Sequence, residues 1–324
     1  MEIGRRSCKR PGRPVASRPA VWDTRPMPTP FAIFCSDQLD PRAIEAEFAG
    51  EVSAARDAGF TSAKLDHDDL DHRIDAASAL RKARFDESGQ AVYRGWMMRA
   101  EAYEALYDAL LARDVRLLTT PAEYAACHHT PGSYRALADW MPRTAWLPKS
   151  AIDDEAAILA ALAPFEGNAV ILKDWVKSQA SGYWSEACFI ADPMDAASVM
   201  RSVDRFRALQ GDSLVGGLVF KQYLPLLPTG HPAHEHRAFV VNGAVVGCWP
   251  RSEEAEQLGS PPPELLDDVA SRIPSPFASA DFGRDTEGRW WLLEVGDGQV
   301  SGLPKPEAAA PIFRALATGL VSRP

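Results

Sequence analysis

Residues 235–246, EHRAFVVNGAVV, decide how the second half of the chain folds. Two runs of β-prone apolar residues, 237–241 and 244–246, flank the dipeptide Asn242-Gly243. Asn-Gly tolerates the positive φ angles that a two-residue type I′ turn requires, so it is a strong hairpin signal. The stretch therefore predicts an antiparallel β-hairpin that has Arg237 at the start of its first strand.

The residues on both sides of this hairpin predict a mixed α+β region. Short apolar, β-prone runs indicate strands at residues 144–147, 169–174, 187–190, 218–224, 277–281 and 290–294. Apolar residues at helical spacing indicate helices at residues 153–162, 199–209 and 308–320. Antiparallel strand pairs predominate in this region, because the last two strands flank a short turn at residues 285–288.

The residues before this region alternate between strands and helices. Strands are predicted at 31–35, 63–65 and 115–118, and helices at 44–55, at 103–110 and from Pro121 onward. A β-α-β order of this kind is typical of a small parallel sheet covered by helices. We therefore expect a disordered basic leader at residues 1–29, a Rossmann-like α/β domain at 30–128 and an α+β domain at 129–324.

Charge is unevenly distributed along the chain. The 324 residues carry a net charge of −9, yet residues 1–30 hold seven basic and two acidic residues and are rich in proline. Such a segment buries too little apolar surface to fold alone, so we expect it to be disordered. A nucleic-acid-binding arm is the alternative interpretation, although the strongly acidic remainder of the chain disfavours a long nucleic-acid partner.

Several protein classes are excluded by what the sequence lacks. The five cysteines are scattered and form no CxxC pair, which argues against a disulfide framework or a structural zinc site. No apolar run reaches the roughly 18–20 residues of a membrane span. A Walker A loop and a Gly-x-Ser-x-Gly elbow are both absent. We expect a cytoplasmic protein with no membrane partner, and the sequence does not indicate its oligomeric state.

Charged residues stand inside or at the ends of the predicted strands. Lys173, Lys221 and Arg237 lie in or beside apolar runs, and Asp281 and Glu294 lie on the last strand pair. A cation in an apolar strand is costly unless it meets an anion. Mg²⁺ binds through one or two carboxylates together with phosphate oxygens. These residues therefore predict a site for a phosphate-bearing ligand and Mg²⁺.

Two further residues extend this predicted site. Lys177 follows Lys173 by four residues, and we expect it to face the same anion. A glycine-rich turn, residues 295–299, follows Glu294 and is expected to be mobile. It would place Asp297 near the same metal.

The order of these features resembles the ATP-grasp superfamily over residues 140–320. Lys173, after Val-Ile-Leu, is similar to that family's first phosphate-binding lysine, and residues 220–224, FKQYL, resemble its adenine-binding hinge. Residues 235–246 resemble the hairpin of ribosomal-protein glutamate ligases. Arg237 with the two lysines resembles the bacterial and phage clade named for one arginine and two lysines.

The sequence also departs from the family pattern. The third metal-binding group, an Asn two residues after the metal-binding Glu, is replaced by Gly296. The flap between the first strand pair, residues 177–182, holds only one glycine. These departures indicate a divergent branch, and residues 31–125 resemble the small domain that precedes ATP-grasp cores only loosely.

The resemblance implies a fold and an activity. The implied fold is two α+β subdomains that clasp ATP, preceded by the small Rossmann-like domain. The implied activity is an ATP- and Mg²⁺-dependent carbon–nitrogen ligase, which phosphorylates a small-molecule or peptide carboxylate and lets an amine or similar nucleophile displace the phosphate. ADP would be released.

The resemblance also implies roles for particular residues. Catalysis falls to Arg237 and Lys177, and the first domain would hold the acceptor near Asp37, Arg94 and Trp96. ATP binding falls to Lys173, Lys177, Lys221, Gln222, Tyr223, Leu224 and Glu235. Metal binding falls to Asp281, Glu294 and Asp297.

Two other functions stay open on the sequence alone. One is a nucleotidyl-transferring enzyme of RNA ends, which would use a lysine as the adenylated nucleophile and release pyrophosphate. The other is a nucleotide-binding protein without turnover, favoured by the missing Asn and the thin flap. Each charged residue taken singly also fits a solvated strand end or a surface ion pair.

Overall fold

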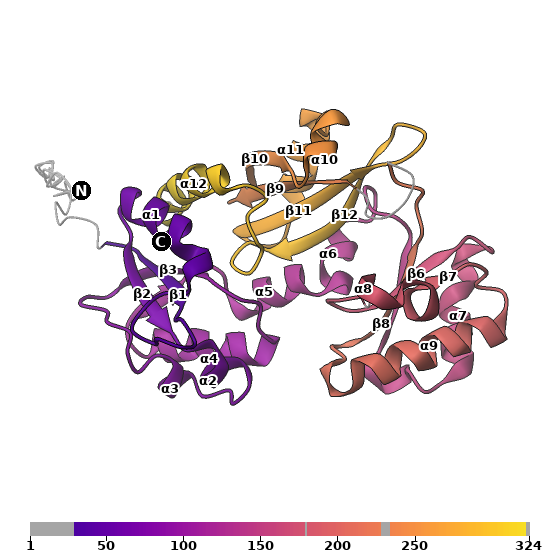
Figure 1. Cartoon of the computed structure of the whole chain (residues 1–324), viewed down its shortest axis with the longest axis horizontal. Helices are drawn as coiled ribbons and strands as arrows, with labels where there is room; N and C mark the ends of the chain where they lie inside the picture. The colour runs from indigo at the N-terminus through magenta and orange to yellow at the C-terminus, as the bar shows by residue number, and fades with distance from the viewer. Residues whose placement is uncertain (1–28, 179, 228–233, 322–324) are drawn as a thin grey trace, which may run out of the picture.

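The computed structural model describes residues 29–178, 180–227 and 234–321 (Figure 1). Residues 1–28 of the expected disordered leader lie outside the described residues. The described chain contains three four-stranded sheets, which belong to three parts of the molecule. Within the part of the chain that the structure describes, no helix has the length and hydropathy to cross a membrane.

The first sheet is parallel, as the alternating pattern predicts. Its strands are β1 (Phe31–Cys35), β2 (Thr61–Leu65), β3 (Gly89–Arg94) and β4 (Val115–Leu117), in the order β2-β1-β3-β4. The sequence did not predict β3, because only three of its six residues are apolar or aromatic and they form no long run. β3 owes its burial to its central position between β1 and β4.

The second sheet contains the predicted hairpin. Its strands are β9 (Glu235–Val241), β10 (Ala244–Pro250), β11 (Phe277–Arg284) and β12 (Trp290–Asp297), in the order β10-β9-β11-β12. All neighbours are antiparallel. Asn242 has a φ of 48° and Gly243 a φ of 76°, so both turn residues adopt the left-handed conformation and the predicted Asn-Gly turn is confirmed.

The third sheet is also antiparallel and forms a separate lobe. Its strands are β5 (Thr144–Pro148), β8 (Gly217–Gln222), β6 (Val170–Asp174) and β7 (Phe189–Ile190), in the order β5-β8-β6-β7. The prediction of a strand over 187–190 is wrong for its first half, because residues Trp184–Cys188 (η4) form a π-helical turn. The predicted strand over 218–224 ends at Gln222.

Helices cover these sheets and connect them. The longer helices are α1 (Ala49–Asp57), α4 (Ala100–Leu111), α5 (Pro121–His128), α6 (Thr130–Leu137), α7 (Glu155–Leu162), α9 (Ala196–Gln210), α11 (Pro263–Arg272) and α12 (Ala309–Val321). The shorter ones are α2 (His67–Asp71), α3 (Ala76–Ala79), α8 (Ala180–Tyr183) and α10 (Glu253–Gln257). Short 3₁₀ turns span Ala46–Phe48, Lys149–Ala151, Ala163–Phe165, Gly211–Ser213 and Pro306–Ala308. Figure 1 shows α5 and α6 running between the parallel-sheet domain and the β5–β8 lobe.

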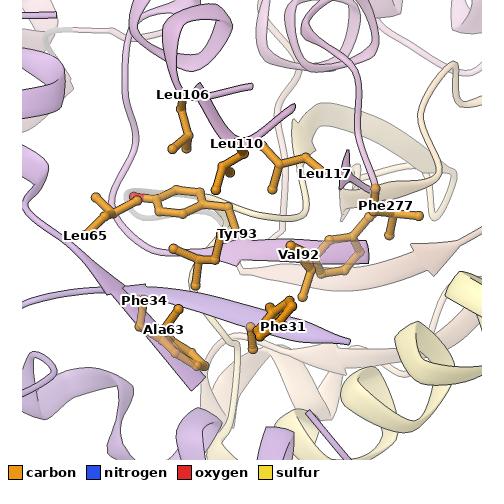
Figure 2. Close-up of a cluster of buried hydrophobic side chains, with 14 of the residues drawn as sticks. Phe31, Phe34, Ala63, Leu65, Val92, Tyr93, Leu106, Leu110, Leu117 and Phe277 are labelled. Atoms are coloured by element: carbon orange, nitrogen blue, oxygen red, sulfur yellow. The ribbon is translucent and has the colours of Figure 1, made fainter. Parts of the chain in front are cut away.

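One hydrophobic core joins the parallel sheet to the C-terminal helix. Phe313 of α12 packs against Phe60, with ring centroids 5.6 Å apart, and also approaches Phe34 of β1. Phe277 of β11 belongs to the same core and lies beside Val92 of β3 (Figure 2). The β5–β8 lobe has a core of its own, built around α7 and α9. The first domain and the β9–β12 sheet therefore share packing that the smaller lobe does not.

A buried arginine links the first domain to the end of β12. Arg94, the last residue of β3, is 2% exposed and donates to both carboxylate oxygens of Glu51 at 2.6 and 2.7 Å. Its Nη1 also donates to the carbonyls of Gly298 and Ser301. The expectation that Arg94 holds an acceptor substrate is therefore wrong, because its donors serve the protein itself.

Removing this guanidinium is expected to destabilise the fold. Arg94→Leu leaves the Glu51 carboxylate buried without its partner, which costs about 3–5 kcal/mol. Urea denaturation measures the loss. The matched control is Arg205→Leu, which removes an exposed ion pair with Glu186 and is expected to cost about 0–1 kcal/mol. Equal losses for the two variants would contradict the role of Arg94.

Candidate functional site

A cavity of about 440 Å³ lies where the β5–β8 lobe faces the β9–β12 sheet. The lobe contributes Lys173 at the end of β6 and Lys177 after it. The sheet contributes Arg237, Asp281 and Glu294. Residues 295–297 and 300–302, with Met97 and His128, complete the walls.

Strand register brings three of the predicted site residues into one row. Asp281 of β11 pairs with Arg237 of β9 on one side and with Glu294 of β12 on the other. Directly opposed residues project from the same face of a sheet, so all three side chains point to the cavity. Arg237 donates to Asp281 through Nε at 2.7 Å and Nη2 at 2.6 Å, and its Nη1 donates to the Gly302 carbonyl at 3.0 Å.

Two lysines from the small lobe reach across to β12. The Nζ of Lys173 donates to Oε1 of Glu294 at 2.7 Å, and the side chain of Lys173 is 12% exposed. The Nζ of Lys221 donates to the carbonyl of Leu293. Leu293 is the extra residue of a β-bulge, because Asp281 pairs with Glu294 while Phe282 pairs with Leu292. The structure thus brings Lys173, Lys221 and the Arg237 row together.

A second ion pair extends the row, and sequence reasoning missed one of its members. Arg251 follows β10 and donates to Glu235 at 2.7 Å, while its Nη1 lies 3.5 Å from Asp281 Oδ2. The Arg251 amide donates to the Glu235 carbonyl, so the hairpin register places the two residues opposite each other. Counting residue pairs outward from the Asn242-Gly243 turn provides the signal that identifies Arg251.

Burial and neighbouring charges shift the pKa values of these groups. Desolvation raises the pKa of Glu294, but Lys173 outweighs it, so that pKa lies below its ordinary value. Burial lowers the pKa of Lys221 to about 8, and the nearby Lys173 charge adds to the effect. Burial and the Asp281 charge raise the pKa of Glu235. The site therefore favours a charged Glu294 and weakens the charge of Lys221.

Asp297 does not join the other two carboxylates. Strand alternation places it on the opposite face of β12 from Glu294, where it is fully buried. Its Oδ1 accepts from the amide and the side chain of Gln299, its Oδ2 has no hydrogen-bond partner among the described residues, and burial raises its pKa to about 7. No group of three His, Cys, Asp or Glu side chains within the described ranges is placed to hold a metal. The predicted three-carboxylate set is therefore not assembled.

The glycine-rich turn after Glu294 is held in place, contrary to the expected mobility. Gln299 donates to the Tyr103 hydroxyl at 2.8 Å and accepts from the Tyr93 amide at 3.2 Å. Arg94 binds the carbonyls of Gly298 and Ser301. These contacts fix the turn to the first domain, so residues 297–302 form a rigid wall of the cavity.

The position of the missing Asn is filled by a pair of hydroxyls. A Cβ added at Gly296 would lie 2.9 Å from Ser301 Oγ and 3.0 Å from Ser279 Oγ, which is closer than real Cβ contacts. The two hydroxyls bond each other at 2.7 Å, and both residues line the cavity. Only glycine fits at 296, and the polar groups at this point come from Ser279 and Ser301. Nothing in the local sequence indicates this pair.

The residues predicted as a hinge follow Lys221 at the end of β8. The amides of Gln222 and Tyr223 donate at 2.8 Å to the carbonyls of Arg143 and Ala169. The Tyr223 ring, 36% exposed, packs edge-on against Phe189 at 5.1 Å. Gln222, Tyr223 and Leu224 are not among the described residues that line the 440 Å³ cavity.

Comparison with known proteins identifies the fold. Residues 164–316 match the family model of an ATP-grasp domain, family 3 of the clade named for one arginine and two lysines. The chain belongs to the ATP-grasp superfamily. The predicted ATP-grasp fold with a preceding parallel-sheet domain is thereby confirmed. No curated protein sequence matches the chain.

Solved structures share this ATP-grasp fold along nearly the whole chain. D-cycloserine synthetase DcsG has a TM-score of 0.58 at 15% identity, covering 90% of this chain and 99% of that one. A RimK domain ATP-grasp protein from Sphaerobacter thermophilus DSM 20745 has a TM-score of 0.57 at 16% identity, covering 90% and 100%. The ATP-grasp ligase PsnB, complexed with precursor peptide PsnA2 and AMPPNP, has a TM-score of 0.51 at 13% identity, covering 92% and 98%.

His128, which lines the cavity, is expected to make the fold sensitive to acid. The ring is 9% exposed and stacks on Tyr124, and burial, with the charges of His129 and Lys177, lowers its pKa from 6.5 to about 4. Unfolded chains bind the proton below pH 6.5 while the folded chain does not. Stability is therefore complete above pH 6.5 and falls by up to about 3 kcal/mol as the pH approaches 4.

Urea titrations between pH 4 and 7 measure this loss against a His128→Phe variant, which should show a flatter profile. The control His72→Phe replaces a side chain that is 74% exposed and should keep the wild-type slope. An unchanged slope in His128→Phe would contradict the assignment.

Proposed function

We propose that the chain is an ATP-dependent ligase that activates a carboxylate as an acylphosphate and joins it to an amine. The carrying observation is the row Arg237–Asp281–Glu294, which faces Lys173 and Lys221 across the cavity. The similar folds of D-cycloserine synthetase and of a ligase complexed with a precursor peptide and AMPPNP support this class of reaction.

The cations of the site suit the phosphates of ATP. Lys173 and Lys177, on the lobe side, would neutralise the α- and β-phosphates, and Lys221 would contact adenine or phosphate. Arg237 presents a planar fork that matches the geometry of a phosphoryl group. In the described state Lys173 and Arg237 are paired with Glu294 and Asp281, so the incoming phosphates would take over these cations.

The adenine would lie by the segment that follows Lys221. Gln222, Tyr223 and Leu224 continue from β8, and Tyr223 presents a partly exposed aromatic ring. Glu235 stands one strand-residue pair from Arg237 and is fixed by Arg251. These residues complete our proposed nucleotide site, with Lys173, Lys221 and Arg237 as its one arginine and two lysines.

Asp281 and Glu294 fit a Mg²⁺ site. Both supply carboxylate oxygens, the donors that Mg²⁺ prefers, and they oppose each other on neighbouring strands. When bound, Mg²⁺ would neutralise phosphate charge. We leave Asp297 out of this set because it faces the other side of β12 and binds Gln299.

The proposed reaction has two steps. A substrate carboxylate oxygen attacks the γ-phosphorus, the bond to the β–γ bridging oxygen breaks, and ADP leaves. The amine nitrogen then attacks the acyl carbon and loses a proton, while the carbon–oxygen bond to the phosphate breaks and inorganic phosphate leaves. Phosphoryl transfer of this kind depends on positioning and charge neutralisation, which Lys173, Lys177 and Arg237 would supply.

The described cysteines suit a reducing compartment. Cys35, Cys127, Cys188 and Cys248 are all free thiols, and the first three are buried. We therefore keep the cytoplasm as the proposed location, and small-molecule or peptide carboxylates and amines as the proposed substrates.

A nucleotide product assay tests the proposed function. The protein is mixed with Mg²⁺, labelled ATP and a pool of carboxylates, amines and short RNA, and the nucleotide products are separated. ADP with phosphate supports acylphosphate chemistry. AMP with pyrophosphate would overturn it in favour of nucleotidyl transfer through a lysyl adenylate.

Two substitutions test the residue assignments. Lys173→Ala removes a charged hydrogen-bond donor worth about 1.5–3 kcal/mol, so ADP affinity should fall about 10- to 100-fold. Glu294→Ala should abolish Mg²⁺-dependent turnover and remove the Mg²⁺ dependence of ADP binding. Isothermal titration calorimetry measures both affinities.

The control for these two variants is Lys305→Ala, which removes a surface pair with Glu256 and should change neither affinity. Unchanged ADP binding in Lys173→Ala would exclude Lys173 from the site. Persisting Mg²⁺-dependent turnover in Glu294→Ala would exclude the metal assignment.

A further inference from the structure

A second cavity, of about 870 Å³, opens between the first domain and the β5–β8 lobe. One wall is residues 71–74 and 97–101 of the first domain, and the other is Lys149 with residues 174–177 and 210–216 of the lobe. His128 and His129 lie between the walls. Met97, His128, Val176 and Lys177 line both this cavity and the 440 Å³ cavity, so the two are continuous.

Ile74, on the first-domain wall, has a strained backbone. Its φ is +53°, whereas the other described non-glycine residues with positive φ are Asp114, Glu166 and Asn242. A β-branched residue in the left-handed region is a true outlier and costs about 1–3 kcal/mol, and such strain gathers at functional sites. Nevertheless its side chain is 43% exposed, so the isoleucine does not serve the core.

The structure holds Ile74 rigidly at this position. Its amide donates to the Leu70 carbonyl at 3.0 Å, and the next residue, Asp75, caps α3 by accepting from the Ser78 amide. Met97, 37% exposed, lies on the same wall, and its carbonyl is bonded to His67 at 3.0 Å. The wall therefore presents two fixed, exposed apolar side chains to the cavity.

The charges of the cavity differ between the junction and the outer walls. Lys177 stands at the junction with the nucleotide cavity. Glu101 and Asp212 line only the outer cavity, and neither makes an ion pair within the described residues, whereas Asp71 is paired with Arg99. Lys149 adds a cation on the lobe wall. A ligand that fits has a carboxylate at the junction and an ammonium group beyond it.

We propose that this cavity binds the carboxylate substrate, and that the substrate is a short peptide with a free amino terminus. Its carboxylate lies by Lys177, its apolar side chains contact Ile74 and Met97, and its ammonium group lies between Glu101 and Asp212. A volume of about 870 Å³ is at the upper end for small-molecule sites, so it exceeds what a single amino acid fills. This inference rests on the proposed ligase function.

The amino terminus is tested with free and Nα-acetylated di- and tripeptide pools. ADP release from Mg-ATP is measured with each pool. Wild type is expected to favour free peptides at least tenfold in kcat/KM. The double variant Glu101→Gln, Asp212→Asn should lose that preference.

The matched control for the double variant is Glu104→Gln. Glu104 lies on the same helix as Glu101, is exposed and does not line the cavity, so the preference should be retained. A double variant that still prefers free peptides would overturn the role of the two carboxylates.

Ile74→Asn separates binding from structure, because asparagine tolerates the left-handed region. The Tm should be equal to or higher than that of wild type and ADP affinity unchanged, while the KM for free peptides rises about tenfold. A raised Tm with an unchanged peptide KM would show that Ile74 does not contact the substrate.

Binding measurements distinguish failure of this inference from failure of the proposed function. If Mg-ADP binds but free peptides neither stimulate ADP release nor protect residues 71–74 and 97–101 from hydrogen exchange, the peptide site is wrong and the ligase proposal stands. If no nucleotide binds, the proposed function fails and this inference fails with it.

Discussion

The register of three neighbouring strands is the constraint on which the site depends. Arg237, Asp281 and Glu294 face the cavity together only because β9, β11 and β12 pair in one alignment. A slip of one residue would turn the slipped side chain to the opposite face. The β-bulge at Leu293 is part of this alignment, because it lets Leu292 stay in the core while Glu294 points to the cavity. Leu293 also offers its carbonyl to Lys221, so the bulge connects the small lobe to the sheet.

The first domain supports the same site from behind. Arg94 and Gln299 tie residues 297–301 to β3 and to Tyr103, and the Gly302 carbonyl of the same turn accepts from Arg237. The phosphate-facing guanidinium is thus held by Asp281 on one side and by a turn anchored in another domain on the other. The shared core that includes Phe277 and Phe313 makes this connection rigid. By contrast, the β5–β8 lobe has its own core and meets the sheet mainly through Lys173 and Lys221.

Local signals in the sequence predicted the main strands and most of the charged cluster. The Asn242-Gly243 turn and the lysines in apolar strands are visible without any tertiary information, and they led to the ATP-grasp fold. What the sequence did not show depends on contacts between distant residues. Strict alternation cannot reveal the bulge at Leu293, and composition cannot show that Arg94 is buried against Glu51. The remaining misses have the same origin: β3, Arg251, the Ser279–Ser301 pair, the orientation of Asp297 and the rigidity of its turn.

The described site is neutralised by its own residues, and this has a consequence for how ligands enter. Asp281 is held by Arg237 and Glu294 by Lys173, so the carboxylates proposed for Mg²⁺ are paired with the cations proposed for phosphate. Mg²⁺ alone would leave these cations without partners, and phosphates alone would do the same to the carboxylates. Exposing either set unpaired in a partly buried site is costly. Nucleotide and metal together replace both sets of partners at once, so the charge pairing itself favours the entry of the metal–nucleotide complex over either ligand alone.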